Sequence, residues 1–222
     1  MSFAPFRILA LAAASAIALP LAACTHEGFG SLEGHYATFS LPEPSGRTVH
    51  VCHAYGCRQK TRFRFTDADI AELSAIMAKW RTKADTPEEE RRGVAYAVGW
   101  IENRVGTAIG TATDRAGMDF AASGDPTQQD CVDEATNTTS YLRVLADAGL
   151  LRHHTVDIPF AKENYLRGIS GWTHWTAVLK ERASPQKWAV DSWIYANGEN
   201  PAVERTEEWY ISSLDELPKP KR

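Results

Sequence analysis

The sequence predicts an α+β protein in which helices come first along the chain and antiparallel strands come later. Apolar residues recur at helical spacing between residues 66 and 149, whereas short strand-like runs follow Leu151. A chain of 222 residues, 44% of them hydrophobic, is long enough for one domain with a substantial core. The formal net charge of −4 leaves no basic surplus to neutralise phosphates, so the composition argues against nucleic-acid binding.

The first residues are typical of an export signal. Arg7 precedes an uninterrupted run of apolar and small residues, 8–19, which is too short to span a bilayer comfortably. The following Leu-Ala-Ala-Cys sequence, ending at Cys24, resembles the lipobox of bacterial lipoproteins. That resemblance implies a signal peptide over 1–23, lipidation of Cys24 and a place in the bacterial cell envelope, and Thr25 suggests the periplasmic face of the outer membrane. An ordinary signal peptide with a chance cysteine is the alternative.

The next two segments are expected to lie outside the main domain. Residues 24–46 are rich in Gly, Ser and Pro and predict a flexible tether. Residues 47–65 contain two strand-like runs around Cys52 and Cys57, which predicts a small hairpin with a disulfide, since an exported compartment is oxidising. A zinc site formed by these cysteines with His50 and His53 is a weaker alternative, because the spacing fits no common zinc pattern.

Three helices are expected at the start of the main domain, which we place at residues 66–215. Thr66 followed by Asp69, and Thr86 followed by Pro87 and Glu89, are capping patterns that predict helix starts. A third helix is expected to begin at Asp125-Pro126 or Thr127 and to end near Gly149.

Three strands are expected after these helices, over residues 153–160, 172–179 and 187–195. The tryptophans among them, including Trp172 and Trp193, are expected mainly in the core.

Cys131 is the first candidate for chemistry. It falls in the first one or two turns of the expected third helix, where the partial positive charge and the free backbone N–H groups favour a thiolate. The same N–H groups could hold the oxyanion of a tetrahedral intermediate. The alternative is a small buried hydrophobic side chain, since free cysteines are often buried.

His174 and Asp191 are candidate partners for this thiol. A cysteine nucleophile needs a base that can also protonate the leaving group, and the imidazole needs an acceptor that fixes its tautomer. The two residues lie on consecutive expected strands and would face each other if the turn were centred between Arg182 and Ala183. The better turn residues come slightly later, so a stagger or bulge is expected. His153 and His154 are weaker candidate bases.

The order and spacing of Cys131, His174 and Asp191 resemble the transglutaminase-like superfamily over roughly residues 88–209. Within it, the export signal and the Asp130-Cys131 pair are similar to bacterial transglutaminase-like cysteine peptidases. The resemblance implies a papain-like core, with the nucleophile helix packed on an antiparallel sheet. It also implies that Cys131 is the nucleophile, His174 the base and Asp191 the orienting acid.

The chain departs from that family around the cysteine. Peptidases of the group typically have a glycine before the Asp-Cys pair and an acid directly after it, with calcium held by these acids, whereas Gln129 and Val132 stand here. Asp130, Asp133 and Glu134 could instead simply favour the positive end of the helix. We therefore expect no cofactor and no metal, with calcium as the alternative.

Gln128 and Gln129 are candidate donors to the oxyanion, although in this family the backbone usually fills that role.

The expected function is that of a lipid-anchored cysteine hydrolase in the cell envelope, acting on amide bonds of a protein or peptide through an acyl-enzyme. Its only expected contact with the membrane is the lipid anchor. The alternative is a non-catalytic envelope lipoprotein that uses the same fold to bind a partner.

Overall fold

The computed structural model describes residues 30–162 and 173–212. The predicted signal peptide, Cys24, Trp172 and the end of the predicted domain at 213–215 lie outside the described residues. The helices are α1 (Leu32–Thr38), α2 (Asp67–Trp80), α3 (Pro87–Ile109), a 3₁₀ turn (Phe120–Ala122), α4 (Cys131–Asp147) and α5 (Thr206–Ile211). The strands are β1 (Thr48–His53), β2 (Gln59–Arg64), β3 (His154–Lys162), β4 (His174–Glu181), β5 (Lys187–Asp191) and β6 (Ala202–Arg205).

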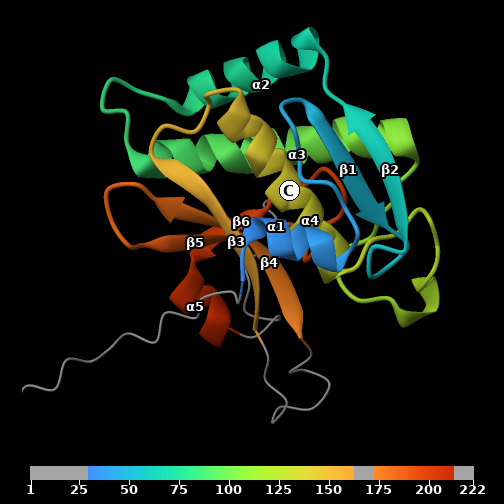
Figure 1. Cartoon of the computed structure of the whole chain (residues 1–222). Helices are drawn as coiled ribbons and strands as arrows, with labels where there is room; N and C mark the ends of the chain where they lie inside the picture. The colour runs from blue at the N-terminus through green and yellow to red at the C-terminus, as the bar shows by residue number, and fades with distance from the viewer. Residues whose placement is uncertain (1–29, 163–172, 213–222) are drawn as a thin grey trace, which may run out of the picture.

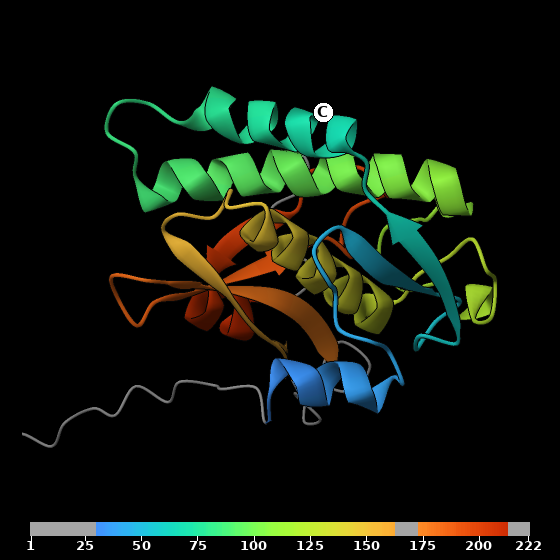
Figure 2. The same cartoon turned by 45° about the horizontal axis from the view of Figure 1, so that its top comes forward.

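The described strands form two antiparallel sheets, which confirms the α+β class. β1 and β2 make a two-stranded sheet, and the other sheet has the order β3-β4-β5-β6. Figure 1 shows α4 in the middle of the molecule, between the two sheets, with α2 and α3 as a paired layer beside it. Figure 2 shows the same layers from another side, with α1 on the face away from α2.

One apolar core joins these layers. It brings together the inner faces of β1 and β2, of α2, α3 and α4, and of β4 and β5. Its fully buried members include Val49, Leu73, Ile101, Leu142 and Leu179. Burial of such side chains stabilises the fold by about 1.5–3 kcal/mol each. None of the described helices is both long and apolar enough to cross a membrane.

The helix starts follow their capping residues. Thr66 and Thr86 each form a capping box with the acid three residues later, as predicted. The expectation for the third helix is wrong by several residues, because α4 begins at Cys131 with Asp130 as its N-cap. Asp125 accepts hydrogen bonds from the backbone and hydroxyl of Thr127, so it closes a local turn instead of starting the helix.

The predicted tether differs from the structure from Ser31 onward. Ser31 caps α1, and its side chain accepts a hydrogen bond from Gly34. Tyr36 is buried, and its hydroxyl lies 3.1 Å from that of Ser140 on α4. The prediction failed because α1 has only seven residues, too few for a periodic apolar pattern, and docks through His35 and Tyr36.

The hairpin and its disulfide are confirmed. β1 pairs with β2 from Thr48 opposite Arg64 to His53 opposite Gln59, and Cys52 is bonded to Cys57. The turn between the strands has four consecutive residues with left-handed backbone, Ala54, Tyr55, Gly56 and Cys57. A left-handed conformation costs a non-glycine residue about 1–2 kcal/mol, so the surrounding contacts must hold this turn in place.

The larger sheet differs from the prediction in two respects. The strand expected over 187–195 ends at Asp191, because Ser192 starts a turn closed by a hydrogen bond from the Tyr195 N–H. Strand β6 and helix α5 were not predicted, since both are short and rich in charged residues.

Candidate active site

Cys131 is the first residue of α4, so the sequence placed it correctly at a helix N-terminus. Its side chain is 4% exposed. The sulfur lies 3.7 Å from the carbonyl oxygen of Thr173 and also contacts the backbone N–H of Trp175. The thiol therefore packs against the backbone on both sides of His174.

The electrostatics of Cys131 differ from the expectation. Burial raises the pKa of the thiol to about 12, and the negative charges of Asp130 and Asp191 act in the same direction. Backbone N–H groups of Trp175 and of Cys131 itself lower the pKa, but by less. The helix terminus was expected to lower the pKa of the thiol. Burial has the larger effect, because a thiolate removed from water loses more stabilisation by hydration than it gains from the helix terminus. At neutral pH the resting group is a thiol.

His174 and Asp191 are in contact, as the sequence suggested. The Nε2 atom of His174 lies 2.6 Å from Oδ2 of Asp191, and both side chains are 1% exposed. The register of β4 and β5 pairs Ala177 with Val190, which continues to Thr176 opposite Asp191. Asp191 is thus the diagonal neighbour of His174, the stagger that the late turn residues predicted.

The other ring nitrogen of His174 is free for a second partner. Among the described residues, Nδ1 of His174 is buried and has no hydrogen bond. Asp191 takes up Nε2, so Nδ1 is the nitrogen that remains to accept a proton from Cys131. Catalytic hydrogen bonds are often long or absent before substrate binds, so the resting geometry is compatible with that role.

Trp209 completes the surroundings of this pair. Its indole N–H donates to the same Oδ2 atom of Asp191 at 2.7 Å, and its ring centroid lies 5.3 Å from that of His174. Trp193 packs on the same imidazole at 4.7 Å. Trp193 and Trp209 are buried, whereas Trp175 and Trp188 are only half-buried, so the expectation of a mainly core role holds in part. The contact of Trp209 with Asp191 was missed because α5 was not predicted.

Asp130 and Asp133 are held by backbone N–H groups. Asp130 Oδ1 accepts from Val132 and Asp133, and Oδ2 accepts from Gly56 in the hairpin turn. Asp133 accepts from Tyr55 through Oδ2 and from Cys57 through Oδ1. All four carboxylate oxygens face hydrogen-bond donors, and Val132 offers no oxygen in its side chain, so these residues do not fit a calcium site.

Glu134 belongs to a separate buried cluster of carboxyl groups. Its Oε2 accepts a hydrogen bond from Ser192 at 2.8 Å, and Asp114 and Glu102 lie next to it. Glu102 itself accepts from the Gly198 N–H. The cluster joins α3, α4 and the residue after Asp191. Sequence reasoning missed Glu102 because helical spacing alone does not show that an acid in an amphipathic helix is buried, and it missed Asp114 because this residue lies in the loop after α3.

These carboxyl groups predict a stability that falls with rising pH. Burial raises the pKa of Glu102 to about 8 and that of Asp114 to about 7. The folded protein therefore keeps protons that the unfolded chain releases near the ordinary pKa values, which are 4.5 for Glu102 and 3.8 for Asp114. The stabilisation is complete below those values and is lost as the pH rises through 7 and 8. Burial lowers the pKa of His35 to about 4, so His35 acts in the opposite direction, but its effect levels off above the ordinary value of 6.5.

We expect the free energy of unfolding to fall by at least about 1 kcal/mol between pH 6.5 and 8.5. Glu102→Gln should reduce this slope, because a neutral amide cannot lose the proton. Glu88→Gln, at an exposed site on the same helix, should leave it unchanged. Urea unfolding at several pH values measures the effect, and equal slopes in the wild type and Glu102→Gln would contradict it.

The two glutamines before Cys131 have structural partners. The side-chain nitrogen of Gln128 donates to the carbonyl of Thr113, and its oxygen accepts from the Arg115 N–H. The side-chain oxygen of Gln129 accepts from Asn137. The amide nitrogen of Gln128 is thus already used, whereas the Cys131 N–H lies beside its own sulfur and is the better placed donor to an oxyanion.

The alternative zinc set is not supported by the geometry. Cys52 and Cys57 are joined to each other and so are not available as thiolates. Asp133 lies close to both sulfurs, and this is the one grouping of His, Cys, Asp and Glu ligand atoms near enough to share an ion in the part of the chain that the structure describes. His53 instead hydrogen-bonds to the Pro126 carbonyl and to Thr61.

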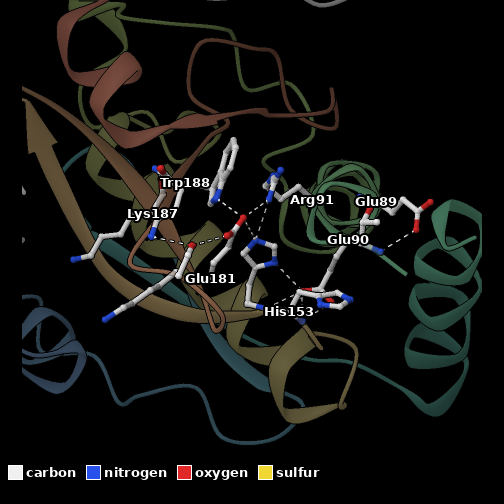
Figure 3. A network of polar contacts seen from close by, with 12 residues as sticks. Glu89, Glu90, Arg91, His153, Glu181, Lys187 and Trp188 are labelled. Carbon is white, nitrogen blue, oxygen red and sulfur yellow. Dashed lines mark hydrogen bonds and ion pairs between the residues drawn. The ribbon is translucent and has the colours of Figure 1, made fainter. Parts of the chain in front are cut away.

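The rival bases belong to a polar network away from Cys131. Figure 3 shows Glu90 and Arg91 on α3 facing His153 and Glu181. Glu90 accepts hydrogen bonds from the backbone of residues 152–154 and lies 2.9 Å from Nδ1 of the fully buried His154. These contacts tie the start of α3 to the larger sheet, so both histidines have structural partners.

The chain was compared with known proteins. No family model, curated protein or solved structure matches it. The case for a function is therefore made by the site itself: a cysteine at a helix start, packed against the backbone on both sides of His174, and a buried His174–Asp191 pair.

Proposed function

We propose that the protein is a cysteine hydrolase of the transglutaminase-like class, with a papain-like core, that acts on amide bonds of a protein or peptide. The observation that carries the proposal is the His174–Asp191 pair, in which Nδ1 of His174 has no hydrogen bond among the described residues. The backbone groups of Thr173 and Trp175, on either side of His174, contact the Cys131 sulfur. A buried imidazole with one nitrogen fixed by a carboxylate and the other unused is arranged to move a proton.

The proposed reaction begins with transfer of the thiol proton from Cys131 to Nδ1 of His174. Because the pKa of the thiol is raised, this transfer occurs as the sulfur attacks the substrate carbonyl carbon, not beforehand. The N–H groups at the start of α4 donate hydrogen bonds to the negatively charged oxygen that forms from the carbonyl.

The second half of the reaction releases both products. The imidazolium gives its proton to the leaving nitrogen, the C–N bond breaks, and a thioester remains on Cys131. Water then adds to the thioester with His174 as base, which yields a carboxylic acid and restores the thiol. An amine in place of water would give transfer instead of hydrolysis.

The proposed location is the bacterial cell envelope, at the periplasmic face of the outer membrane, with the chain anchored through lipid on Cys24. The Leu-Ala-Ala-Cys sequence and the Cys52–Cys57 disulfide, which suits an oxidising compartment, support this proposal.

Turnover of a simple peptide thioester tests the proposed activity. We expect the full chain to release the thiol product, and we expect Cys131→Ala to reduce this rate to the background. Added amine should divert part of the acyl group to an amide if transfer competes with hydrolysis. A wild-type rate equal to that of Cys131→Ala would contradict the proposal.

One observation favours a second function. The Cys131 thiol is buried and protonated, and no hydrogen bond joins it to His174 within the described residues. A non-catalytic envelope module that binds a protein partner would retain such a thiol as part of its core, and it would show no thioester turnover.

A further inference from the structure

The turn of the β1–β2 hairpin docks on the start of the nucleophile helix. The N–H groups of Tyr55 and Cys57 donate to Asp133 at 2.8 and 2.6 Å, and the Gly56 N–H donates to Asp130 at 2.9 Å. Three successive backbone donors thus meet the two acids on either side of Cys131 and Val132. Successive N–H groups in such a turn form a concave site for anions.

This arrangement depends on a backbone that most residues avoid. The backbone angle φ is +70° at Ala54, +66° at Tyr55, +65° at Gly56 and +56° at Cys57. Only Gly56 adopts such a value without a steric penalty. The Cys52–Cys57 bond closes this segment at its last residue, and Ala54 adds a backbone hydrogen bond to the Gln128 carbonyl.

The docked turn matters for Cys131 because of the charges beside it. Asp130 is the N-cap of α4, so its position determines where the helix begins and where the sulfur of Cys131 lies. Burial raises the pKa of both Asp130 and Asp133, whereas their hydrogen bonds from the turn counteract that shift. Without the turn, two buried acids would face each other with fewer donors, and the first turn of α4 would lose its support.

We propose that the disulfide-closed turn 54–57 is a positioning element for the nucleophile, and that the Cys52–Cys57 bond supports catalysis by Cys131 because it holds this turn in its left-handed conformation. This inference rests on the proposed function and adds a redox dependence to it. Reduction by a dithiol transfers two electrons and two protons to the bond, leaves Cys52 and Cys57 as thiols and closes the reductant to its own disulfide.

Two disulfide-free variants of the full chain form a matched pair. Cys52→Ala/Cys57→Ala requires alanine to adopt the left-handed backbone at position 57, whereas Cys52→Ala/Cys57→Gly does not. We expect the alanine variant to lose at least tenfold in thioester turnover and the glycine variant to recover a measurable part of that loss. Circular dichroism at the assay temperature confirms that each variant is folded, and wild-type protein reduced with dithiothreitol and then reoxidised should lose and regain activity.

Two further readouts separate positioning from general support of the fold. His174→Ala should lower turnover strongly in the wild-type background but much less in Cys52→Ala/Cys57→Ala, because the thiol no longer lies beside the imidazole. Alkylation of Cys131 by iodoacetamide, measured on its own peptide, should become faster in the alanine variant than in the glycine variant, since the start of α4 opens.

The outcomes distinguish this inference from the proposed function. If the wild type shows no turnover dependent on Cys131, the proposed function fails, and the alkylation rates still decide whether the turn positions the thiol. Turnover within twofold of the wild type in both variants overturns the inference and leaves the proposed function standing. Equal losses in the alanine and glycine variants, or equal alkylation rates in all three proteins, also overturn it.

Discussion

Replacing Asp191 with asparagine should slow turnover about 10- to 100-fold, and adding Trp209→Phe should deepen the loss towards about 10⁴-fold. The difference follows from the hydrogen bonds of Oδ2. Both the His174 ring and the Trp209 indole lie against this one atom, so the indole N–H forces an asparagine to place its oxygen there. Nε2 of His174 then keeps its proton and Nδ1 stays available as the base, although the negative charge that supports the imidazolium is gone.

Removing the indole N–H releases that constraint. In Asp191→Asn/Trp209→Phe the amide can turn its nitrogen towards His174, which stabilises the wrong tautomer and occupies the base. Trp209→Phe alone should cost less than about tenfold, because phenylalanine retains the aromatic contact with His174 and loses one hydrogen bond. Turnover in the four proteins forms a double-mutant cycle. Losses that simply add in free energy would contradict the proposed role of Trp209.

The second prediction with a large expected effect concerns the stability of the fold and the polar network of Figure 3. Glu90→Ala should lower the free energy of unfolding by about 3–5 kcal/mol, the cost of breaking a buried charged network by removing one partner. The Glu90 side chain is 4% exposed, and its loss leaves the N–H groups of residues 152–154 and the buried His154 ring without their acceptor.

The matched control is Glu88→Ala, two residues away on α3. The side chain of Glu88 is 65% exposed and pairs with an equally exposed Arg92, so we expect a change below about 0.5 kcal/mol. Thermal unfolding measures both variants, with a decrease of roughly 10 °C expected for Glu90→Ala. Burial alone would raise the pKa of Glu90, but hydrogen bonds from His154 and the backbone hold it below its usual value. The difference between the wild type and Glu90→Ala should therefore shrink as the pH falls below 4.5.

The parts of the fold that could be predicted have strong local signals. Thr66 with Asp69 and Thr86 with Glu89 are capping boxes that need no tertiary information, and the strands around His174 and Asp191 show in β-branched and aromatic residues. The short elements α1, β6 and α5 could not be predicted, because segments of four to seven residues form through their contacts with the rest of the fold.

The same distinction between local signals and long-range contacts applies to the candidate active site. The contact of His174 with Asp191 could be inferred from spacing, since two strands joined by a short turn bring such residues together. The raised pKa of Cys131 could not, because burial depends on the backbone of residues 173–175 that packs on the sulfur. Trp209 and the left-handed turn at 54–57 act on the site from distant parts of the sequence, and no local pattern signals either contact.

The most direct test of the central claim is to trap the acyl-enzyme. Full-length protein is mixed with excess peptide thioester, quenched in acid and measured by intact mass. We predict one acyl group on Cys131, removable by hydroxylamine, absent from Cys131→Ala and formed far more slowly by His174→Ala. No adduct on the wild type, or equal rates of formation in the wild type and His174→Ala, would contradict a nucleophile activated by this histidine.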